Sequence, residues 1–294
     1  MRPLEFRWAH AVNSQALLRE VTEDVTRAHA QAFRVPNYVN AIEADIIWSE
    51  RQQQPVMGHP PQTDGDLPLH SFLDEMLVLA RKFEAQGYTP SEAQPSGFAT
   101  PWIVKLDFKS MHAFQVAYPL LGEFVTAFPY KHGVFINADI LPGPANTPDV
   151  HFEAHEFLEM ATALGAKDVE KTSKLVLSVG WTTANATDEE IHRCYTKEMV
   201  DSMFTALQPF RATGMRVTFP LRATCFRQSW SVLRPLVDGI EHHGITLWWT
   251  KFELPTTDLE WIYKTLENDE SLAGRTFYDI LGFDKFMATR RLST

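Results

Sequence analysis

The most informative stretch for the fold is Trp102-Ile103-Val104-Lys105-Leu106-Asp107-Phe108-Lys109. Alternate side chains of a β-strand face opposite sides, so one face of this stretch is wholly apolar. The other face carries Lys105, Asp107 and Lys109, which are costly to enclose unless they are paired or bind an ion. The stretch therefore predicts a strand whose apolar face packs on helices and whose charged face points into a barrel.

Short apolar runs of this kind alternate with helical patterns along the whole chain. The eight expected strands are Phe6–Ala9, Ala41–Ile47, Ile103–Phe108, Val134–Ala138, Leu175–Val179, Arg216–Phe219, Thr246–Trp249 and Phe277–Leu281. The expected helices include Ser14–Ala32, Leu69–Gln86, Met111–Ala127, Asp149–Leu164, Asp188–Leu207, Arg227–His242 and Thr257–Glu267. Strands that alternate with helices are typical of parallel βαβ units.

Eight such units in 294 residues predict an α/β fold, a (β/α)8 barrel of the TIM type. We expect one domain over residues 1–294, with its core from about residue 5 to about residue 283. An open, doubly wound sheet is the alternative, because closure is not visible in a sequence. Three Pro- and Gly-rich stretches interrupt the pattern, Arg51–Pro68, Gly87–Pro101 and Leu141–Asp149, and the first is expected to hold a short strand near Val56.

Composition excludes several classes of protein. The net charge of −10 argues against a nucleic-acid binder and against simple docking on anionic membranes. No apolar run approaches the roughly 18 residues that span a bilayer, and the amino terminus does not resemble a secretory signal. We therefore expect a cytoplasmic location. The two cysteines, Cys194 and Cys225, exclude a disulfide scaffold and a multi-thiolate zinc site.

Three carboxylates are the candidate metal ligands. Glu43 and Asp45 lie on one face of the second expected strand, and Asp107 lies on the charged face of the third. Carboxylate oxygens suit Mg²⁺ or Ca²⁺. Lys105 and Lys109 would then balance part of the charge or hold an anionic substrate. The alternative is structural, because the ion pairs Lys105–Glu43 and Lys109–Asp45 would also explain these charges.

Two histidines are the candidate proton-transfer groups. His10 directly follows the first expected strand, and His59 lies in the excursion after the second. Both fall where loops gather at the carboxyl-terminal mouth of a barrel, the usual catalytic face. A pair of imidazoles can act as general base and acid, and with a cation and carboxylates they favour phosphodiester cleavage. A lone histidine is otherwise a hydrogen-bonded structural residue.

Other side chains are candidates for the wall of a substrate pocket. Asn137 and Asp139 share strand parity, although they also fit a turn into the following Pro- and Gly-rich stretch. The remaining candidates end or follow later strands and are Trp181, Arg222, Trp249 and Lys251.

Seven of these segments together resemble the menorin family, in order, from about His10 to Phe283. They are Trp8-Ala9-His10-Ala11-Val12-Asn13-Ser14, Ile42-Glu43-Ala44-Asp45-Ile46, Gly58-His59-Pro60-Pro61, Lys105-Leu106-Asp107-Phe108-Lys109-Ser110, Asn137-Ala138-Asp139-Ile140-Leu141-Pro142-Gly143-Pro144, Ser178-Val179-Gly180-Trp181-Thr182-Thr183 and Val217-Thr218-Phe219-Pro220-Leu221-Arg222-Ala223. Without a secretory signal, the chain is most similar to the soluble, intracellular-type branch.

The menorin family is similar in turn to glycerophosphodiester phosphodiesterases of the phospholipase-C-like superfamily. The matching motifs imply that the metal ligands are Glu43, Asp45 and Asp107. They imply that the catalytic residues are His10, His59 and Lys109. They imply metal-dependent attack on a phosphodiester. One route for this reaction is attack by a neighbouring substrate hydroxyl, which forms a cyclic phosphate.

The chain departs from that second pattern at three points. Ala11-Val12 replaces Arg-Gly, Pro60 replaces an Asp, and Asp107 is one methylene shorter than the usual Glu. Arg222 or Lys105 are the candidates to replace the missing cation.

Three functions therefore compete. The first is a divalent-metal-dependent phosphodiesterase acting on a glycerophosphodiester or a lysophospholipid-like substrate. The second is a non-catalytic recognition protein, since secreted menorin relatives belong to cell-surface recognition complexes and a fold does not fix a function. The third is a binding module for a phosphorylated metabolite or lipid headgroup. The sequence names no protein partner.

Overall fold

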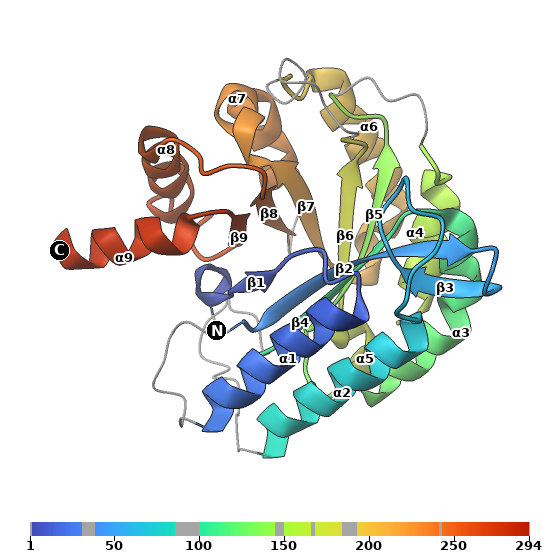
Figure 1. Cartoon of the computed structure of the whole chain (residues 1–294). Helices are drawn as coiled ribbons and strands as arrows, with labels where there is room; N and C mark the ends of the chain where they lie inside the picture. Colours follow the sequence, from blue (N-terminus) through green and yellow to red (C-terminus); the bar gives the residue numbers. More distant parts are fainter. Residues whose placement is uncertain are drawn as a thin grey trace.

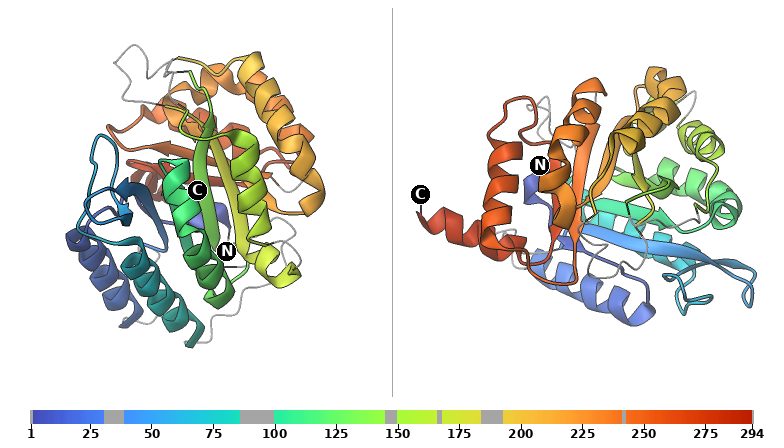
Figure 2. Two further views of the ribbon diagram at one scale, coloured as in Figure 1. Left: turned by 90° about the vertical axis from the view of Figure 1, so that its right-hand side faces the viewer. Right: turned by 90° about the horizontal axis from the view of Figure 1, so that it is seen from above.

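The strands form a nearly closed barrel. The computed structural model describes residues 2–30, 39–85, 100–144, 150–165, 168–183, 193–240 and 243–293. Within them, eight parallel strands follow one another in the order β1-β2-β4-β5-β6-β7-β8-β9, with helices outside (Figures 1 and 2). The strands are β1 (Trp8–Ala9), β2 (Ala41–Ser49), β4 (Ile103–Phe108), β5 (Val134–Leu141), β6 (Leu175–Trp181), β7 (Arg216–Arg222), β8 (His243–Trp249) and β9 (Thr276–Ile280). The prediction of a TIM-type barrel, in preference to an open sheet, is confirmed.

The excursion after β2 is the short strand β3 (Gln54–Met57), which pairs antiparallel with β2. Its register sets Met57 opposite Ile46, close to the carboxyl-terminal half of β2. The expected small strand in this Pro-rich stretch is therefore confirmed.

The helices follow the expected order, with differences at their ends. They are α1 (Gln15–Ala30), α2 (Leu69–Ala85), α3 (Met111–Ala127), α4 (Ala154–Ala163), α5 (Val169–Lys174), α6 (Lys197–Leu207), α7 (Ala223–Gly239), α8 (Thr256–Glu267) and α9 (Phe283–Ser293), with short 3-10 helices η1 (Pro3–Glu5) and η3 (Gln208–Thr213). The helix α3 has the expected bounds, because the Ser110 side chain accepts a hydrogen bond from the Ala113 amide and caps it.

Three helix starts differ from the prediction, and two helices were not predicted. Helix α6 begins at Lys197, because the Thr196 side chain caps it by accepting from the Met199 amide, and residues 193–196 are not helical. Helix α4 begins at Ala154, because the Glu153 carboxylate caps it through the amides of His155 and Glu156. Helix α7 begins directly after β7, four residues before the expected start. Helices α5 and α9 were not expected. Some of the predicted helix ends lie outside the described residues. These are the starts at residues 149 and 188 and the last residues 31–32, 86 and 242. Most of the 87–101 stretch lies outside them as well.

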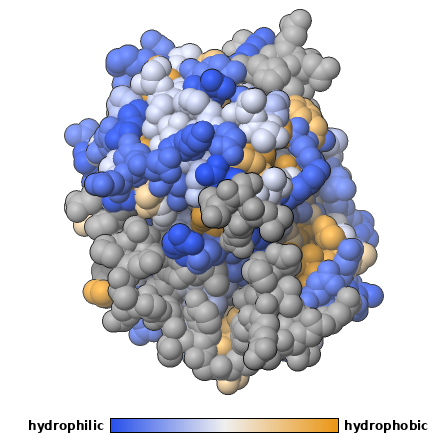
Figure 3. Space-filling view, turned by 90° about the vertical axis from the view of Figure 1, so that its left-hand side faces the viewer, coloured by the Kyte–Doolittle hydropathy of each residue, from blue (hydrophilic) through white to orange (hydrophobic). Residues whose placement is uncertain are grey.

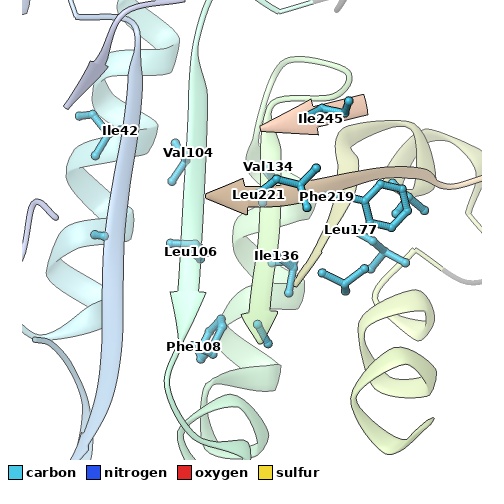
Figure 4. Packing of buried hydrophobic residues seen from close by; sticks show 14 of the residues in the cluster. Ile42, Val104, Leu106, Phe108, Val134, Ile136, Leu177, Phe219, Leu221 and Ile245 are labelled. Atoms are coloured by element: carbon cyan, nitrogen blue, oxygen red, sulfur yellow. The ribbon is translucent and has the colours of Figure 1, made fainter. Parts of the chain in front are cut away.

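Apolar side chains fill the space between the strands and the helices. Residues such as Ile42, Val104, Leu106 and Ile136 lie on neighbouring strands of this outer layer (Figure 4). Strand alternation places their sequence neighbours on the inner face of the barrel. The outer layer is the main hydrophobic core.

A second, smaller cluster closes the amino-terminal end of the barrel interior. It lies near the starts of the strands and consists of Phe6, Ala41, Ile103, Phe135, Val176 and Phe277, with Trp8 packed against it. We call this cluster the barrel plug. On β4, Lys105 and Asp107 follow the plug residue Ile103 on the same face and therefore lie nearer the carboxyl-terminal end of the barrel.

The barrel plug also joins the two end strands of the sheet. The ring of Phe277 in β9 lies 5.7 Å from that of Phe6 and 6.0 Å from that of Trp8 in β1, between ring centroids. Packing of these aromatic rings therefore holds the seam between β1 and β9 together.

On the face shown in Figure 3, the coloured residues are mostly hydrophilic and are interrupted by apolar patches. Among the described helices, none is both long and apolar enough to cross a bilayer.

We predict that Phe277→Ala lowers the free energy of unfolding by about 3–5 kcal/mol, because it removes a buried ring from both the barrel plug and the seam. Urea unfolding followed by circular dichroism measures this loss. Val116→Ala, at a position that is 43% exposed on α3, is the control and should change stability by less than about 0.5 kcal/mol. Equal losses in the two variants would contradict the role of the plug.

Candidate functional site

Charged and polar side chains form a ring at the carboxyl-terminal end of the barrel interior. In register, Glu43 lies beside Lys105, Asp45 beside Asp107, and Asp107 beside Asn137. All five side chains are buried. The alternation that gave β4 one charged face therefore extends across three neighbouring strands and gathers these charges in one place.

The three carboxylates Glu43, Asp45 and Asp107 come together. Each offers an oxygen, and these oxygens lie within 4.8 Å of one another. Among the described residues this is the one group of three or more acidic, His or Cys side chains with such spacing. Their number and chemistry fit a hard divalent cation.

The loop after β1 holds two of the carboxylates in place. The Ala11 amide donates to Glu43 Oε2 at 2.7 Å. The Asn13 side chain donates to Asp45 Oδ2 at 2.7 Å and accepts from the Asp45 amide at 2.8 Å. This loop thereby fixes the orientation of both acids before any ligand binds.

Lys109 bridges two of the acids. Its Nζ lies 2.7 Å from Asp45 Oδ1 and 2.7 Å from Asp107 Oδ2. The Lys109–Asp45 ion pair of the structural alternative is therefore present, and Lys109 also pairs with Asp107. Burial disfavours the charged forms, but the attraction outweighs it, so the pKa of Lys109 is raised well above its ordinary value and the pKa of Asp107 is lowered.

Glu43 differs from Asp107 in the direction of its pKa shift. Burial raises its pKa, and the opposing effect of His10 does not cancel the rise. The positive charge of Lys105, the register neighbour of Glu43, also lowers the pKa of Glu43. The surrounding protein therefore disfavours the charged form of Glu43.

His10 lies between two acids at the mouth of the barrel. Its Nδ1 is 2.7 Å from Asp279 Oδ2 and 3.5 Å from Glu43 Oε2. Its ring stacks on Trp248 at an interplanar angle of 12°. Burial works to lower the pKa of His10, but the charges of Glu43 and Asp279 outweigh it and raise the pKa to about 10.

His59 lies near the same mouth but faces solvent. The preceding residue, Gly58, donates its amide to the Asp45 carbonyl at 3.0 Å, which ties this loop to β2. The His59 ring is exposed, and its Nδ1 lies 2.6 Å from the Pro60 carbonyl oxygen. The described contacts thus attach the backbone of this loop to the site and leave the ring in solvent.

Asn137 and Asp139 lie within strand β5, not in a turn. The Asn137 side chain accepts from Ser178 Oγ at 2.5 Å and bonds to Asp107. Asp139 is beside Gly180, where an added Cβ would come within 2.7 Å of Asp139 Oδ1. Burial, joined by the charge of Asp107, raises the pKa of Asp139 to about 7.

Arg222 lies at the end of β7 and is buried. Its guanidinium donates to the Thr183 carbonyl oxygen at 2.6 Å, and its register neighbour in β8 is Trp248. Arg222 therefore reaches the same end of the barrel as the carboxylates.

Trp181, Trp249 and Lys251 lie elsewhere. Trp181 and Trp249 belong to the outer core, where Trp181 packs on Tyr195 and Trp249 on Phe252. Lys251 is exposed, with Nζ 5.9 Å from the centroid of the Trp249 ring. The expectation that these residues line the pocket is corrected by strand alternation, which turns the two tryptophans toward the helices.

Three residues of the site were not expected from the sequence: Asn13, Trp248 and Asp279. Trp248 and Asp279 are register neighbours on β8 and β9. The signal for Asp279 was present, because Phe277 and Asp279 share one face of an expected strand. Asn13 lies in a loop within one of the menorin-like segments, but no strand or helix pattern indicates its contact with Asp45.

We predict that Lys109→Met lowers the free energy of unfolding by about 3–5 kcal/mol at neutral pH in the presence of a chelator, because it leaves two buried carboxylates without their cation. The pKa of Asp107 is lowered in the fold, so its pairing stabilises the protein above the ordinary value of 3.8 and is lost as the pH falls. The difference from the unmodified protein should therefore shrink below about pH 4.

Urea unfolding at several pH values measures that difference. The control is Lys264→Met, whose lysine is 64% exposed and pairs with Glu260 on the surface of α8. It should cost less than about 1 kcal/mol at every pH. A loss of the same size in both variants would contradict the bridging role of Lys109.

Comparison with known proteins identifies the family of this chain. Residues 3–282 match the Menorin N-terminal domain, so α9 lies beyond the matched part. The chain is also similar to "Protein FAM151B" of Homo sapiens, with 28% identity over 281 residues, which cover 94% of this chain and 83% of that protein. Because the domain match spans nearly the whole barrel, the protein belongs to the menorin family.

Proposed function

We propose that this protein is a divalent-metal-dependent phosphodiesterase that acts on a glycerophosphodiester or a lysophospholipid-like substrate. One observation carries the proposal: Glu43, Asp45 and Asp107 converge within 4.8 Å at the mouth of the barrel, next to His10 and Lys109. Carboxylates, a proton-transfer group and a cation at the catalytic face of a barrel are what cleavage of a phosphodiester requires.

The residues present fit Mg²⁺ or Ca²⁺. Glu43, Asp45 and Asp107 would hold the cation through carboxylate oxygens, which both ions prefer. The raised pKa of Glu43 marks a buried acid whose charged form a nearby cation would stabilise. When bound, a divalent cation polarises a phosphoryl oxygen and offsets the charge that develops on it.

The chain's own residues supply the remaining steps. His10 presents Nδ1 to Asp279, so its other ring nitrogen, Nε2, is the one left to exchange a proton with the attacking or leaving oxygen. Lys105 and Lys109 contribute positive charge that favours an anionic substrate at this mouth. Arg222, at the end of β7, and Lys105, on β4, are the two candidates to replace the arginine that Ala11-Val12 lacks.

The proposal extends to the relationship with glycerophosphodiester phosphodiesterases and to a cytoplasmic, intracellular-branch location. The order of the acids, the lysine and His10 supports the relationship. The chain holds only two cysteines, Cys194 and Cys225, and so lacks the multiple cysteines of a disulfide scaffold, which suits a reducing compartment. The exposed ring of His59 means that it would join the reaction only through substrate that reaches out to it.

A non-catalytic binding role is the alternative, and Lys109 favours it. Its ammonium already satisfies Asp45 and Asp107, so the site could keep its charges balanced without a metal. In that case the same mouth would hold a phosphorylated headgroup without cleaving it.

We predict that the protein binds Ca²⁺ or Mg²⁺ at one site and that Glu43→Gln abolishes this binding, because it removes a charged oxygen ligand. Isothermal titration calorimetry of chelator-treated protein with each ion measures it. Glu50→Gln is the matched control, since Glu50 follows the same strand but is exposed. Binding that survives in Glu43→Gln would contradict the proposed metal centre.

We predict metal-dependent release of product from a panel of glycerophosphodiesters and lysophospholipids, which a chelator stops. His10→Ala should lower kcat by about 10²–10⁴-fold, the usual contribution of a general acid or base. His155→Ala is the control, because this histidine lies 64% exposed on α4. Binding of these lipids without product, equal in both variants, would support the binding role instead.

A further inference from the structure

The contact between His10 and Asp279 joins the two ends of the barrel. His10 follows β1 and Asp279 lies on β9, the last strand, and 269 positions separate them in the sequence. Their side chains approach to 2.7 Å, on the polar side of the seam that the barrel plug closes below. The contact therefore exists only in the closed barrel.

The geometry of this contact fixes one edge of the imidazole. A carboxylate accepts hydrogen bonds and cannot donate them, so the ring nitrogen that faces Asp279 must carry the proton. That nitrogen is Nδ1. The opposite nitrogen, Nε2, is thereby directed away from Asp279 as the atom for proton exchange.

Two further contacts decide which acid holds the ring. Glu43 Oε2 is farther from Nδ1, at 3.5 Å, and already accepts the Ala11 amide at 2.7 Å. Trp248, the register neighbour of Asp279, stacks against the ring face with centroids 6.5 Å apart. Strands β8 and β9 thus supply both the stacking surface and the nearer acceptor.

We propose that Asp279 is the positioning residue for His10, which it orients by accepting the Nδ1 proton so that Nε2 faces the reacting oxygens. This inference rests on the proposed function, in which His10 transfers a proton. Asp279 itself touches neither substrate nor metal ligand in this role. Its effect should therefore appear in the turnover number and in the state of the imidazole, and hardly in substrate binding.

The test follows the Nδ1 proton of His10 by nuclear magnetic resonance of protein with ¹⁵N-labelled histidine, assigned by its loss in His10→Ala. A proton held by a carboxylate gives a downfield resonance that exchanges slowly with water. We expect Asp279→Ala to abolish it and Asp279→Asn to retain it, shifted upfield, because the amide oxygen is a neutral acceptor. Asp258→Asn, an exposed residue of α8 paired with Arg227, should leave it unchanged.

The same variants are assayed for metal-dependent hydrolysis. We expect Asp279→Ala to lower kcat by about 10²-fold with KM nearly unchanged, and Asp279→Asn to recover part of that loss. A resonance that persists in Asp279→Ala, or a kcat that does not fall, would overturn the inference. If the Ala variant does not fold, an unshifted resonance in Asp279→Asn overturns it equally.

Failure of the proposed function gives a different result. A protein that turns over no phosphodiester, yet loses the Nδ1 resonance in Asp279→Ala, would refute the reaction and leave the positioning of the ring by Asp279 standing.

Discussion

The structure depends on how the barrel supports ionised side chains in its interior. Each buried charge costs several kcal/mol unless it is compensated, and three carboxylates gather within 4.8 Å. Lys109 compensates two of them, and the loop after β1 orients Glu43 and Asp45 through Ala11 and Asn13. Because these contacts come from separate strands, the charges are balanced only when the barrel has formed. The contacts that compensate the buried charges also hold these charged side chains together in one site.

The interior of the barrel is divided between two kinds of chemistry. The aromatic and aliphatic plug fills the amino-terminal end and holds the seam, so that end contributes stability. The carboxyl-terminal end holds the acids, the lysines and His10. Since the plug is apolar and buried, charges next to it act in a low-dielectric environment, where their interactions are stronger than in water. This setting is the basis for our proposal that the carboxyl-terminal end of the barrel holds a cation and a phosphate.

Much of this could be predicted from the sequence, because period-two alternation in β2 and β4 is unambiguous. Both strands carry acids on one face and only apolar residues on the other, so the convergence of Glu43, Asp45 and Asp107 followed once the strands were taken as parallel. Alternation in β8 was harder to use, since two tryptophans stand side by side, and the inward one is Trp248. The pairing of Asp279 with His10 needs closure of the barrel, a long-range property that no local pattern encodes.

The central claim is that the three acids form a cation site. Anomalous diffraction from crystals soaked in Ca²⁺ tests it most directly. The account predicts one peak coordinated by oxygens of Glu43, Asp45 and Asp107 at about 2.3–2.6 Å. A crystal without a peak at this position, in which Lys109 still bridges Asp45 and Asp107 at saturating calcium, would contradict it.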